Sequence, residues 1–334
     1  MTEAKNIIEI KNLQRRFPVK EGLFGKPKDF VYAVNSVDLE MPAGKTIGLV
    51  GESGCGKTTI GKLIAGLDIP DGGSILYAGK AVKSMTAEER KSFHKKIQII
   101  FQNPYGSLNP RQRISQTFKE VLGVHKIVPK AEISRETERL LDTVGITSDY
   151  QNHYPFEFSG GQRQRLCIAR ALAVRPEVVV CDEPVSALDV SVQSQILNLL
   201  KKLQREFQLT YLFISHDLSV VYHTCDKVYI MYLGKIMEEG NVEEIFNSPR
   251  HPYTQALLSA IPVPDPKTKR KRIILGGDVP NPTSLPEGCF FYSRCPKHMP
   301  VCRQNPPNVT FSQSHRAACW LYAEKKQSGD AIPQ

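Results

Sequence analysis

GESGCGKT, at residues 51–58, is the stretch of sequence that decides the fold. It matches the pattern G-x-x-x-x-G-K-[ST]. An apolar run at residues 46–50 precedes it, and apolar residues then recur every three or four positions through residues 57–67, which predicts a strand, a glycine-rich loop and a helix in that order. This is the context in which the pattern binds nucleotide phosphates. The loop residues that we expect to bind them are Gly51, Ser53, Gly54, Cys55, Gly56, Lys57, Thr58 and Thr59.

The residue types in this loop suit a polyanion. Its glycines let backbone N–H groups curl around phosphate oxygens, the start of the following helix adds a positive dipole, and Lys57 adds a point charge. Thr58 can place its hydroxyl on a magnesium ion. Cys55 occupies a variable position of the pattern, where a permitted filler is favoured over a redox role.

Two adjacent carboxylates end a second apolar run, at residues 178–181. A buried strand of a parallel sheet presents its C-terminal end to the ligand. We therefore expect Asp182 to bind the magnesium ion and Glu183 to face the terminal phosphate. A single acidic residue would be more typical of a helix cap or a surface charge. The pair follows both a strand and a phosphate-binding loop, which favours a function.

A second candidate anion site is SGGQ, at residues 159–162. A helix-like segment follows it, so the N–H groups of Ser159, Gly160 and Gly161 and the helix dipole favour a phosphate there. An ordinary capped helix start is the alternative interpretation. The phosphate-binding loop and the paired carboxylates in the same chain favour the anion site.

Strands and helices alternate along most of the chain. Further strand-like runs lie at residues 7–13, 31–39, 96–101, 177–181, 210–214 and 227–231. One long amphipathic helix is predicted at residues 192–207. This alternation predicts an α/β fold with a mainly parallel sheet that helices cover on both faces. Residues 110–155 are polar and helix-forming without a strand signal, which predicts a helical insertion.

Together these motifs resemble those of ABC-transporter ATPase subunits. FSGGQ is close to the family signature LSGGQ and departs from it only at Phe158. Gln102 in IIFQNP resembles the Q-loop, Asp189 in SALD the D-loop, and His216 in FISHD the switch histidine. The resemblance covers roughly residues 7–250, with all motifs in the family's order.

The resemblance implies a P-loop NTPase core of the ABC type at residues 1–255, with an antiparallel β subdomain and a helical subdomain at about residues 105–165. It also implies a dimer, in which one chain completes the ATP site of the other. The residues that would do so are Ser159, Gly160, Gly161, Gln162 and Asp189.

The same resemblance implies ATP hydrolysis with Mg²⁺. Glu183 would polarise the attacking water, and Gln102 and His216 would orient it. Gln102 would also join Thr58 and Asp182 around the magnesium ion.

An aromatic residue near the start of the family's chains usually stacks on adenine. Phe17 occupies that position here, and Phe24 and Tyr32 are the alternatives. Stacking suits a flat base but tolerates substitution, and a lone phenylalanine near a chain start is also typical of a core.

Two further stretches resemble the ATPase subunits of bacterial dipeptide and oligopeptide importers, whose close relatives carry nickel. They are YGSLNP at residues 105–110 and NSPRHPYTQALLSAIP at residues 247–262, and the proline-rich, cysteine-bearing tail agrees with them. The match is close to the "F" type of subunit. This implies a heterodimer with a homologous second ATPase subunit, two membrane-spanning permease subunits and an external substrate-binding protein.

Other classes fit less well. A redox-sensing regulator without a membrane partner is the main alternative, and an importer ATPase for nickel or another small solute is a second. A P-loop kinase or GTPase would leave SGGQ and SALD without a role.

Four cysteines crowd into the tail, where we expect a proline-rich linker at residues 256–286, an extension at residues 287–325 and a frayed end at residues 326–334. They are Cys289, Cys295, Cys302 and Cys319, spaced C-x5-C-x6-C-x16-C. Structural zinc usually starts from closer pairs, whereas four thiolates also suit an iron–sulfur cluster. The resemblance implies a [4Fe-4S] cluster here, with zinc or free thiols as alternatives. His298 and His315 are possible substitute ligands that we expect to be solvent-exposed.

Charge and hydropathy limit the location and partners. The 44 Lys and Arg residues exceed the 34 Asp and Glu residues, which gives a net charge of +10. The basic residues are dispersed and no zinc-finger spacing occurs, so nucleic acid is not favoured. The longest apolar stretches are shorter than the about 18 residues of a membrane-spanning helix, and the N-terminal residues do not resemble a secretory signal. We expect a peripheral protein on the cytoplasmic face of the cell membrane.

Overall fold

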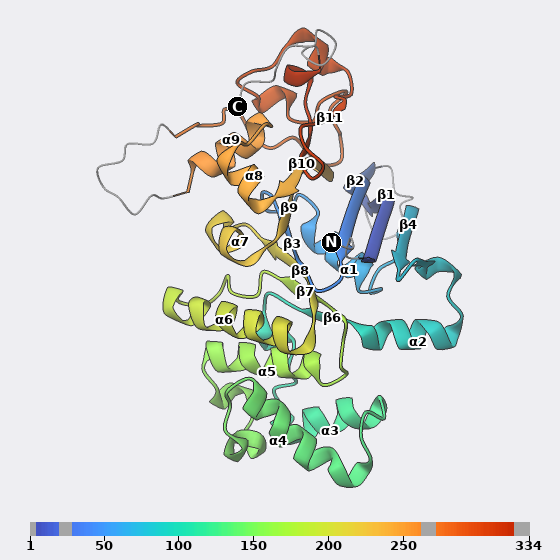
Figure 1. The fold of residues 1–334 in the computed structure, drawn as a ribbon, viewed down its shortest axis with the longest axis vertical. Coiled ribbons are helices and arrows are strands. Elements are labelled where there is room, and N and C mark those ends of the chain that lie inside the picture. The colour runs from blue at the N-terminus through green and yellow to red at the C-terminus, as the bar shows by residue number, and fades with distance from the viewer. Residues whose placement is uncertain (1–4, 20–28, 262–271, 324–334) are drawn as a thin grey trace.

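The computed structural model describes residues 5–19, 29–261 and 272–323, which form two β-sheets with helices around them (Figure 1). The strands, in chain order, are β1 (Asn6–Val19), β2 (Asp29–Pro42), β3 (Thr46–Val50), β4 (Gly72–Tyr77), β5 (Lys80–Ala81), β6 (Ile97–Ile100), β7 (Val178–Asp182), β8 (Thr210–Ser215), β9 (Lys227–Tyr232), β10 (Lys235–Asn241), β11 (Asn308–Thr310) and β12 (Arg316–Ala318). The α-helices are α1 (Lys57–Ile64), α2 (Ala87–Lys96), α3 (Ile114–Val124), α4 (Ile133–Thr143), α5 (Gly160–Leu172), α6 (Val190–Phe207), α7 (Leu218–Thr224), α8 (Val242–Asn247) and α9 (Pro252–Ser259).

The larger sheet contains the strand that leads into the glycine-rich loop. Its order is β11-β12-β10-β9-β3-β8-β7-β6, and the strands from β9 to β6 run parallel. Every residue of β3, β7 and β8 is buried, because helices cover both faces of a parallel sheet and apolar side chains are needed on each. The predicted parallel α/β core is confirmed.

The smaller sheet has the order β2-β1-β4-β5 and is antiparallel. Alternate residues of its first two strands face the core, among them Ile8, Ile10, Val37 and Leu39, which are all buried. The antiparallel β subdomain is therefore present.

Helices α3, α4 and α5 lie at the lower end of the molecule in Figure 1. Their apolar faces share a core that contains Phe118, Leu122, Leu141 and Leu166. Helices α3 and α4 fall within residues 110–155, where the polar sequence without a strand signal predicted a helical insertion.

The C-terminal extension, residues 287–323, joins the larger sheet. Strand β12 pairs with β10, where Glu238 lies opposite Ala317, and β11 pairs with β12. Phe291 packs against the rings of Tyr232 and Tyr253. Neither strand was predicted, because strands of three residues are too short to show an alternating pattern.

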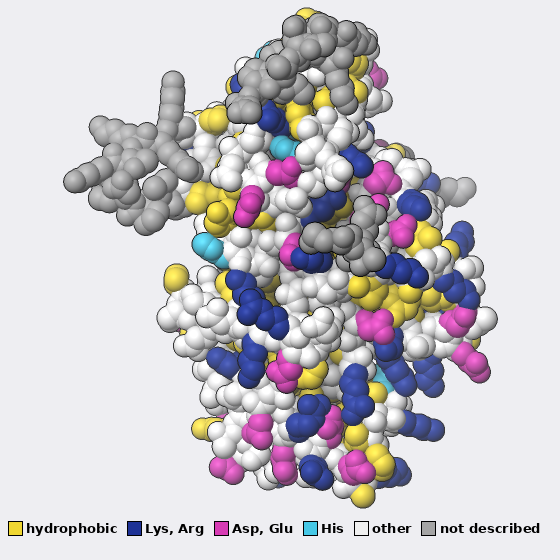
Figure 2. All heavy atoms as spheres, viewed as in Figure 1, with side chains coloured by type: hydrophobic (Ala, Val, Ile, Leu, Met, Phe, Trp, Pro, Cys, Tyr) yellow, Lys and Arg dark blue, Asp and Glu magenta, His cyan; other side chains and the backbone are white. Residues whose placement is uncertain are grey.

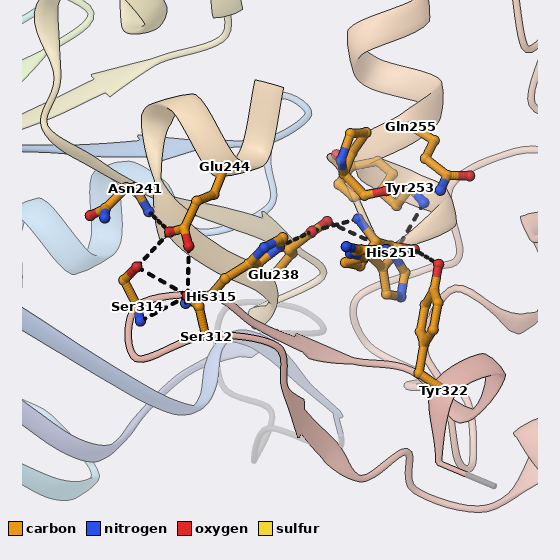
Figure 3. Close-up of polar contacts among 12 residues, drawn as sticks. Glu238, Asn241, Glu244, His251, Tyr253, Gln255, Ser312, Ser314, His315 and Tyr322 are labelled. Atoms are coloured by element: carbon orange, nitrogen blue, oxygen red, sulfur yellow. Dashed lines mark hydrogen bonds and ion pairs between the residues drawn. The ribbon is translucent and has the colours of Figure 1, made fainter. Parts of the chain in front are cut away.

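A polar network fastens this extension to β10 and α8 (Figure 3). The Glu238 carboxylate lies 2.7 Å from Nε2 of His315, and Glu244 accepts a hydrogen bond from Ser312 at 2.6 Å. The expectation that His315 is exposed was wrong: only 3% of its surface is accessible, because its ring is inserted beside Glu238. His298 is exposed, as expected.

The surface seen in Figure 2 carries scattered Lys and Arg side chains with Asp and Glu between them. On this face the positive charge is not gathered into one large patch. None of the helices in the described ranges combines the length and the apolar character that a membrane span requires.

Candidate nucleotide-binding site

The glycine-rich loop connects β3 to α1, and its glycines are there for steric reasons. Gly56 precedes the first turn of α1 with φ of 107°, and Gly54 has φ of 78°, both in the region that favours glycine. A Cβ atom on Gly56 would lie 2.0 Å from the carbonyl oxygen of Ala33, and one on Gly51 would lie 2.1 Å from that of Met231. The loop can therefore follow this path only with glycine at positions 51 and 56, whereas Gly54 is favoured by its backbone angle alone.

Lys57 is the first residue of α1 and is buried, with 5% of its surface accessible. Its ammonium group donates hydrogen bonds to the carbonyl oxygens of Gly51 at 2.8 Å and Glu52 at 2.9 Å. The lysine thus folds back over the loop, and a positive charge lies where the loop's N–H groups would hold phosphates.

Thr58 and Asp182 meet between α1 and the end of β7. The Thr58 hydroxyl donates to a carboxylate oxygen of Asp182 at 3.0 Å. Burial raises the pKa of Asp182, the neighbouring Glu183 raises it further, and the bond from Thr58 opposes both. A cation beside this carboxylate would favour its charged form, so this hydroxyl and carboxylate fit a magnesium ion.

Glu183 lies between two polar side chains from neighbouring strand ends. Its carboxylate accepts a hydrogen bond from the Gln102 amide at 2.8 Å and lies 3.2 Å from Nδ1 of His216. The backbone of Glu183 has φ of 47°, and its N–H group donates to the carbonyl oxygen of Ile214. Because β6, β7 and β8 are parallel neighbours, residues that follow each of them meet at one edge of the sheet. The structure therefore brings together all three residues predicted to be catalytic.

The SGGQ segment starts α5. Ser159 and Gln162 cap each other: the Ser159 hydroxyl accepts from the Gln162 N–H group at 3.3 Å, and the Gln162 side chain accepts from the Ser159 N–H group at 2.9 Å. Gly161 approaches α6 so closely that a Cβ atom would lie 2.5 Å from Val192. Phe158 is buried against Tyr150, which accounts for a large ring at the position that departs from LSGGQ.

This second segment does not share a location with the glycine-rich loop. Helix α1 packs on β7 and β8, whereas α5 packs on α4 and α6, in the lower half of Figure 1. Asp189 precedes α6 as its N-terminal cap residue.

Two of the three candidates for adenine stacking lie in β1 and β2. Phe17 is 36% exposed, and the guanidinium of Arg15 lies 4.6 Å from the centre of its ring. Tyr32 is half-buried in β2, and Phe24 lies outside the described residues.

Two residues outside the glycine-rich loop, Tyr253 and Arg294, hold it in place, and neither was predicted from the sequence. The N–H group of Glu52 donates to the hydroxyl of Tyr253 at 3.0 Å. The Glu52 carboxylate accepts two hydrogen bonds from Arg294, at 2.8 and 3.1 Å. No local sequence pattern could indicate these contacts, because the pairs lie 201 and 242 positions apart.

Three of the four tail cysteines are buried, and Cys295 is partly buried. Burial raises the pKa of Cys289 to about 11 and that of Cys319 to about 12, and the charges of the other tail thiols raise both further. Across the described ranges, no three His, Cys, Asp or Glu side chains form a group that could hold a metal ion.

Of the other cysteines, Cys55, Cys167 and Cys181 are buried, which is typical of free cysteines that pack as small apolar residues. Cys225 is partly exposed.

A phosphate loop with a buried lysine, a hydroxyl–carboxylate pair and a flanked glutamate define a nucleoside triphosphatase. Comparisons with known proteins give the family. Residues 34–186 match the ABC transporter family, and residues 237–302 match the oligopeptide/dipeptide transporter C-terminal region.

Two relatives are similar over nearly their whole length. The oligopeptide transport ATP-binding protein AppF of Bacillus subtilis is 46% identical over 329 residues, which cover 97% of this chain and 100% of AppF. The dipeptide transport ATP-binding protein DppF of Escherichia coli is 45% identical over 319 residues, which cover 96% of this chain and 95% of DppF. The chain belongs to the ATP-binding subunits of ABC transporters that carry the oligopeptide/dipeptide C-terminal region, and it is an ATPase.

Two solved structures share the fold. Part of the ABC transporter complex cbiONQ, cbiO1 from Clostridium perfringens, has a TM-score of 0.61 and 26% identity and covers 73% of this chain and 91% of its own. The ATP-binding cassette MJ0796, in a dimeric post-hydrolysis state bound to ADP and Pi, has a TM-score of 0.61 and 26% identity and covers 70% of this chain and 98% of its own.

Proposed function

We propose that this chain hydrolyses ATP to power the import of dipeptides or oligopeptides through a membrane complex. The relatives' names give peptide transport, and the match of residues 237–302 supports the same group. The observation that carries the catalytic part is the convergence of Lys57, Asp182 and Glu183 at one end of the parallel sheet.

Each side chain in this site has a proposed task in phosphoryl transfer. Lys57 binds the β- and γ-phosphates. Thr58, Asp182 and Gln102 would hold Mg²⁺, which would neutralise negative charge on the phosphate oxygens. Glu183 polarises the attacking water. Gln102 and His216 orient that water and hold the Glu183 carboxylate from both sides.

We assign the SGGQ segment to the ATP of a second ATPase subunit. Its place on α5, apart from the chain's own glycine-rich loop, supports this, as does the dimeric state of the solved cassette with ADP and Pi. ATP then stabilises the closed dimer as long as its γ-phosphate contacts both the glycine-rich loop of one subunit and the SGGQ segment of the other. Hydrolysis removes this shared contact. The residues that we assign to the partner's ATP are Ser159, Gly160, Gly161, Gln162 and Asp189. Phe17 is assigned to the adenine ring.

The partners we propose follow from the same group. They are a homologous second ATPase subunit, two permease subunits and an external substrate-binding protein, with this chain peripheral on the cytoplasmic face. The ATPase domain is residues 1–255, with a helical subdomain at about residues 105–165, and residues 256–286 link it to the extension at residues 287–325.

We retain a [4Fe-4S] cluster on Cys289, Cys295, Cys302 and Cys319 as a proposal, and no step of the reaction depends on it. Its support is the resemblance together with four thiols in one C-terminal extension, three of them buried. Protein purified anaerobically should be brown and contain iron and acid-labile sulfide in equal amounts. Colourless protein that contains zinc would overturn the assignment.

Transport itself gives the test of the proposed function. A chromosomal deletion of this chain should abolish uptake of a radiolabelled dipeptide, and the wild-type chain should restore it. The Glu183→Gln chain should not, although a tagged version should still co-purify with hydrophobic permease subunits. Uptake that is normal in the deletion strain, with no permease in the purified material, would contradict the proposal.

A further inference from the structure

We propose that Arg294 of the C-terminal extension is a positioning residue for the phosphate-binding loop. It neutralises Glu52, the second residue of GESGCGKT, and so allows the loop to accept a triphosphate. This inference rests on the proposed ATP site and adds to it a supporting contact from a different part of the chain.

The contact is specific and partly shielded from solvent. One terminal nitrogen of Arg294 donates to both carboxylate oxygens of Glu52, at 2.8 and 3.1 Å, and lies 3.4 Å from the hydroxyl of Tyr232. The Arg294 side chain is 10% exposed and that of Glu52 is 26% exposed. An ion pair with this burial is screened less by salt than one on the open surface.

Arg294 is held in place by the extension itself. It ends a short 3₁₀ turn, residues 292–294, in which its N–H group donates to the carbonyl oxygen of Phe291. Phe291 is fully buried and packs on Tyr232 and Tyr253.

A second path reaches the same loop residue. Tyr253 is fully buried, and its hydroxyl accepts the N–H group of Glu52 at 3.0 Å. The backbone N–H group of Tyr253 donates to Nδ1 of His251. The backbone N–H group of His251 donates to the carboxylate of Glu238 at 2.9 Å. Glu238 in turn pairs with His315 of the extension (Figure 3). Both the backbone and the side chain of Glu52 are therefore tied to the C-terminal part of the chain.

Charge explains why this pair matters for ATP. Glu52 places a carboxylate in a loop whose ligand is a polyanion, and its carbonyl oxygen also binds Lys57 at 2.9 Å. With Arg294 present, the carboxylate is neutralised and points away to the extension. Without Arg294, the free carboxylate would repel the phosphates and compete for Lys57.

The test is a double-mutant cycle on the purified full-length chain, with binding of a fluorescent ATP analogue and phosphate release as readouts. Arg294→Ala should weaken nucleotide binding and raise KM for ATP about 10-fold, while kcat falls less than about 3-fold. The double variant Arg294→Ala with Glu52→Gln should recover most of the lost affinity, because the neutral amide no longer repels phosphate. Arg294→Lys should retain part of the wild-type affinity for the nucleotide.

Two controls make the result interpretable. Arg303→Ala removes an exposed arginine from the same extension, whose guanidinium lies 5.8 Å from the Tyr292 ring centre, and should leave KM unchanged. Thermal unfolding identifies variants that fail to fold. The proposal is overturned if folded Arg294→Ala binds ATP normally, or if the double variant is as weak as Arg294→Ala. A wild-type chain that binds no ATP would instead contradict the nucleotide site itself.

Discussion

The Gln102 amide donates a hydrogen bond of 2.8 Å to one carboxylate oxygen of Glu183, and the other oxygen lies 3.2 Å from Nδ1 of His216. The three side chains follow three parallel strands, so the sheet itself sets their spacing. A carboxylate held from both sides is oriented before the nucleotide arrives. This arrangement suits a group that must orient or deprotonate a single water.

Glu183→Gln should leave ATP binding intact and lower kcat about 100-fold or more, because the amide cannot accept a proton from water. The variant should also trap the ATP-bound closed state. Phosphate release and nucleotide binding measure the two effects separately. Glu206→Gln, an exposed carboxylate on α6, is the matched control and should behave like the wild type. Undiminished turnover by Glu183→Gln would rule out the role assigned to it.

Gln102 should show a charge-dependent effect. Gln102→Ala removes one of the two partners of Glu183 and should lower kcat about 10-fold, within the range typical of lost positioning. Gln102→Glu should be worse, since a second carboxylate about 3 Å away repels that of Glu183 and disturbs its position. Equal kcat values for the two variants would contradict this arrangement.

The two glycines of the loop with positive φ should differ in their tolerance of a side chain. Gly54→Ala meets no atom within 4 Å and should lose only about 1–2 kcal/mol from the left-handed backbone. Gly56→Ala would also place its Cβ atom 2.0 Å from the carbonyl oxygen of Ala33. We expect that variant to lose nucleotide binding or to unfold at a clearly lower temperature. Similar melting temperatures and affinities for both would show that the loop path described here is wrong.

His251 should make stability depend on pH. Burial lowers its pKa from 6.5 to about 4, and Glu238 opposes this shift. Between these two values the unfolded chain binds a proton at residue 251 that the folded chain does not, so the free energy of unfolding falls as the pH falls. From pH 7 to pH 5 the loss from this residue should be about 2 kcal/mol.

Urea denaturation at pH 7 and at pH 5 measures this loss in the free energy of unfolding. His251→Asn keeps an acceptor for the N–H group of Tyr253 at the start of α9 but cannot titrate, so its stability should fall less over the same range. An equally steep loss in the variant would assign the effect to other groups.

The central fold could be predicted because its signals are local. The five buried residues of β3 form a continuous apolar run, and the structure places this strand at Thr46–Val50, as predicted. The helix after the loop was predicted through Leu67 but ends at Ile64, and Leu67 is 57% exposed. Periodicity alone does not show where a helix ends, because an exposed leucine fits the apolar pattern as well as a buried one.

Other elements had no usable signal. Helix α2 buries only Phe93, so it lacks an apolar face. The motif residues of the site could be named from spacing, since each motif is contiguous. Arg294 and Tyr253 could not, because they reach Glu52 only after the extension and α9 have packed on the core.

The most direct measurement of the central claim is a cryo-electron microscopy structure of the tagged transporter complex, purified from its own host with the Glu183→Gln chain, ATP and Mg²⁺. The account predicts that the triphosphate on Lys57 is also contacted by a serine–glycine helix start from a second ATPase chain. Residues 159–162 of this chain should likewise touch the nucleotide of that neighbour. A triphosphate that faces solvent, with residues 159–162 distant from any nucleotide, would contradict it.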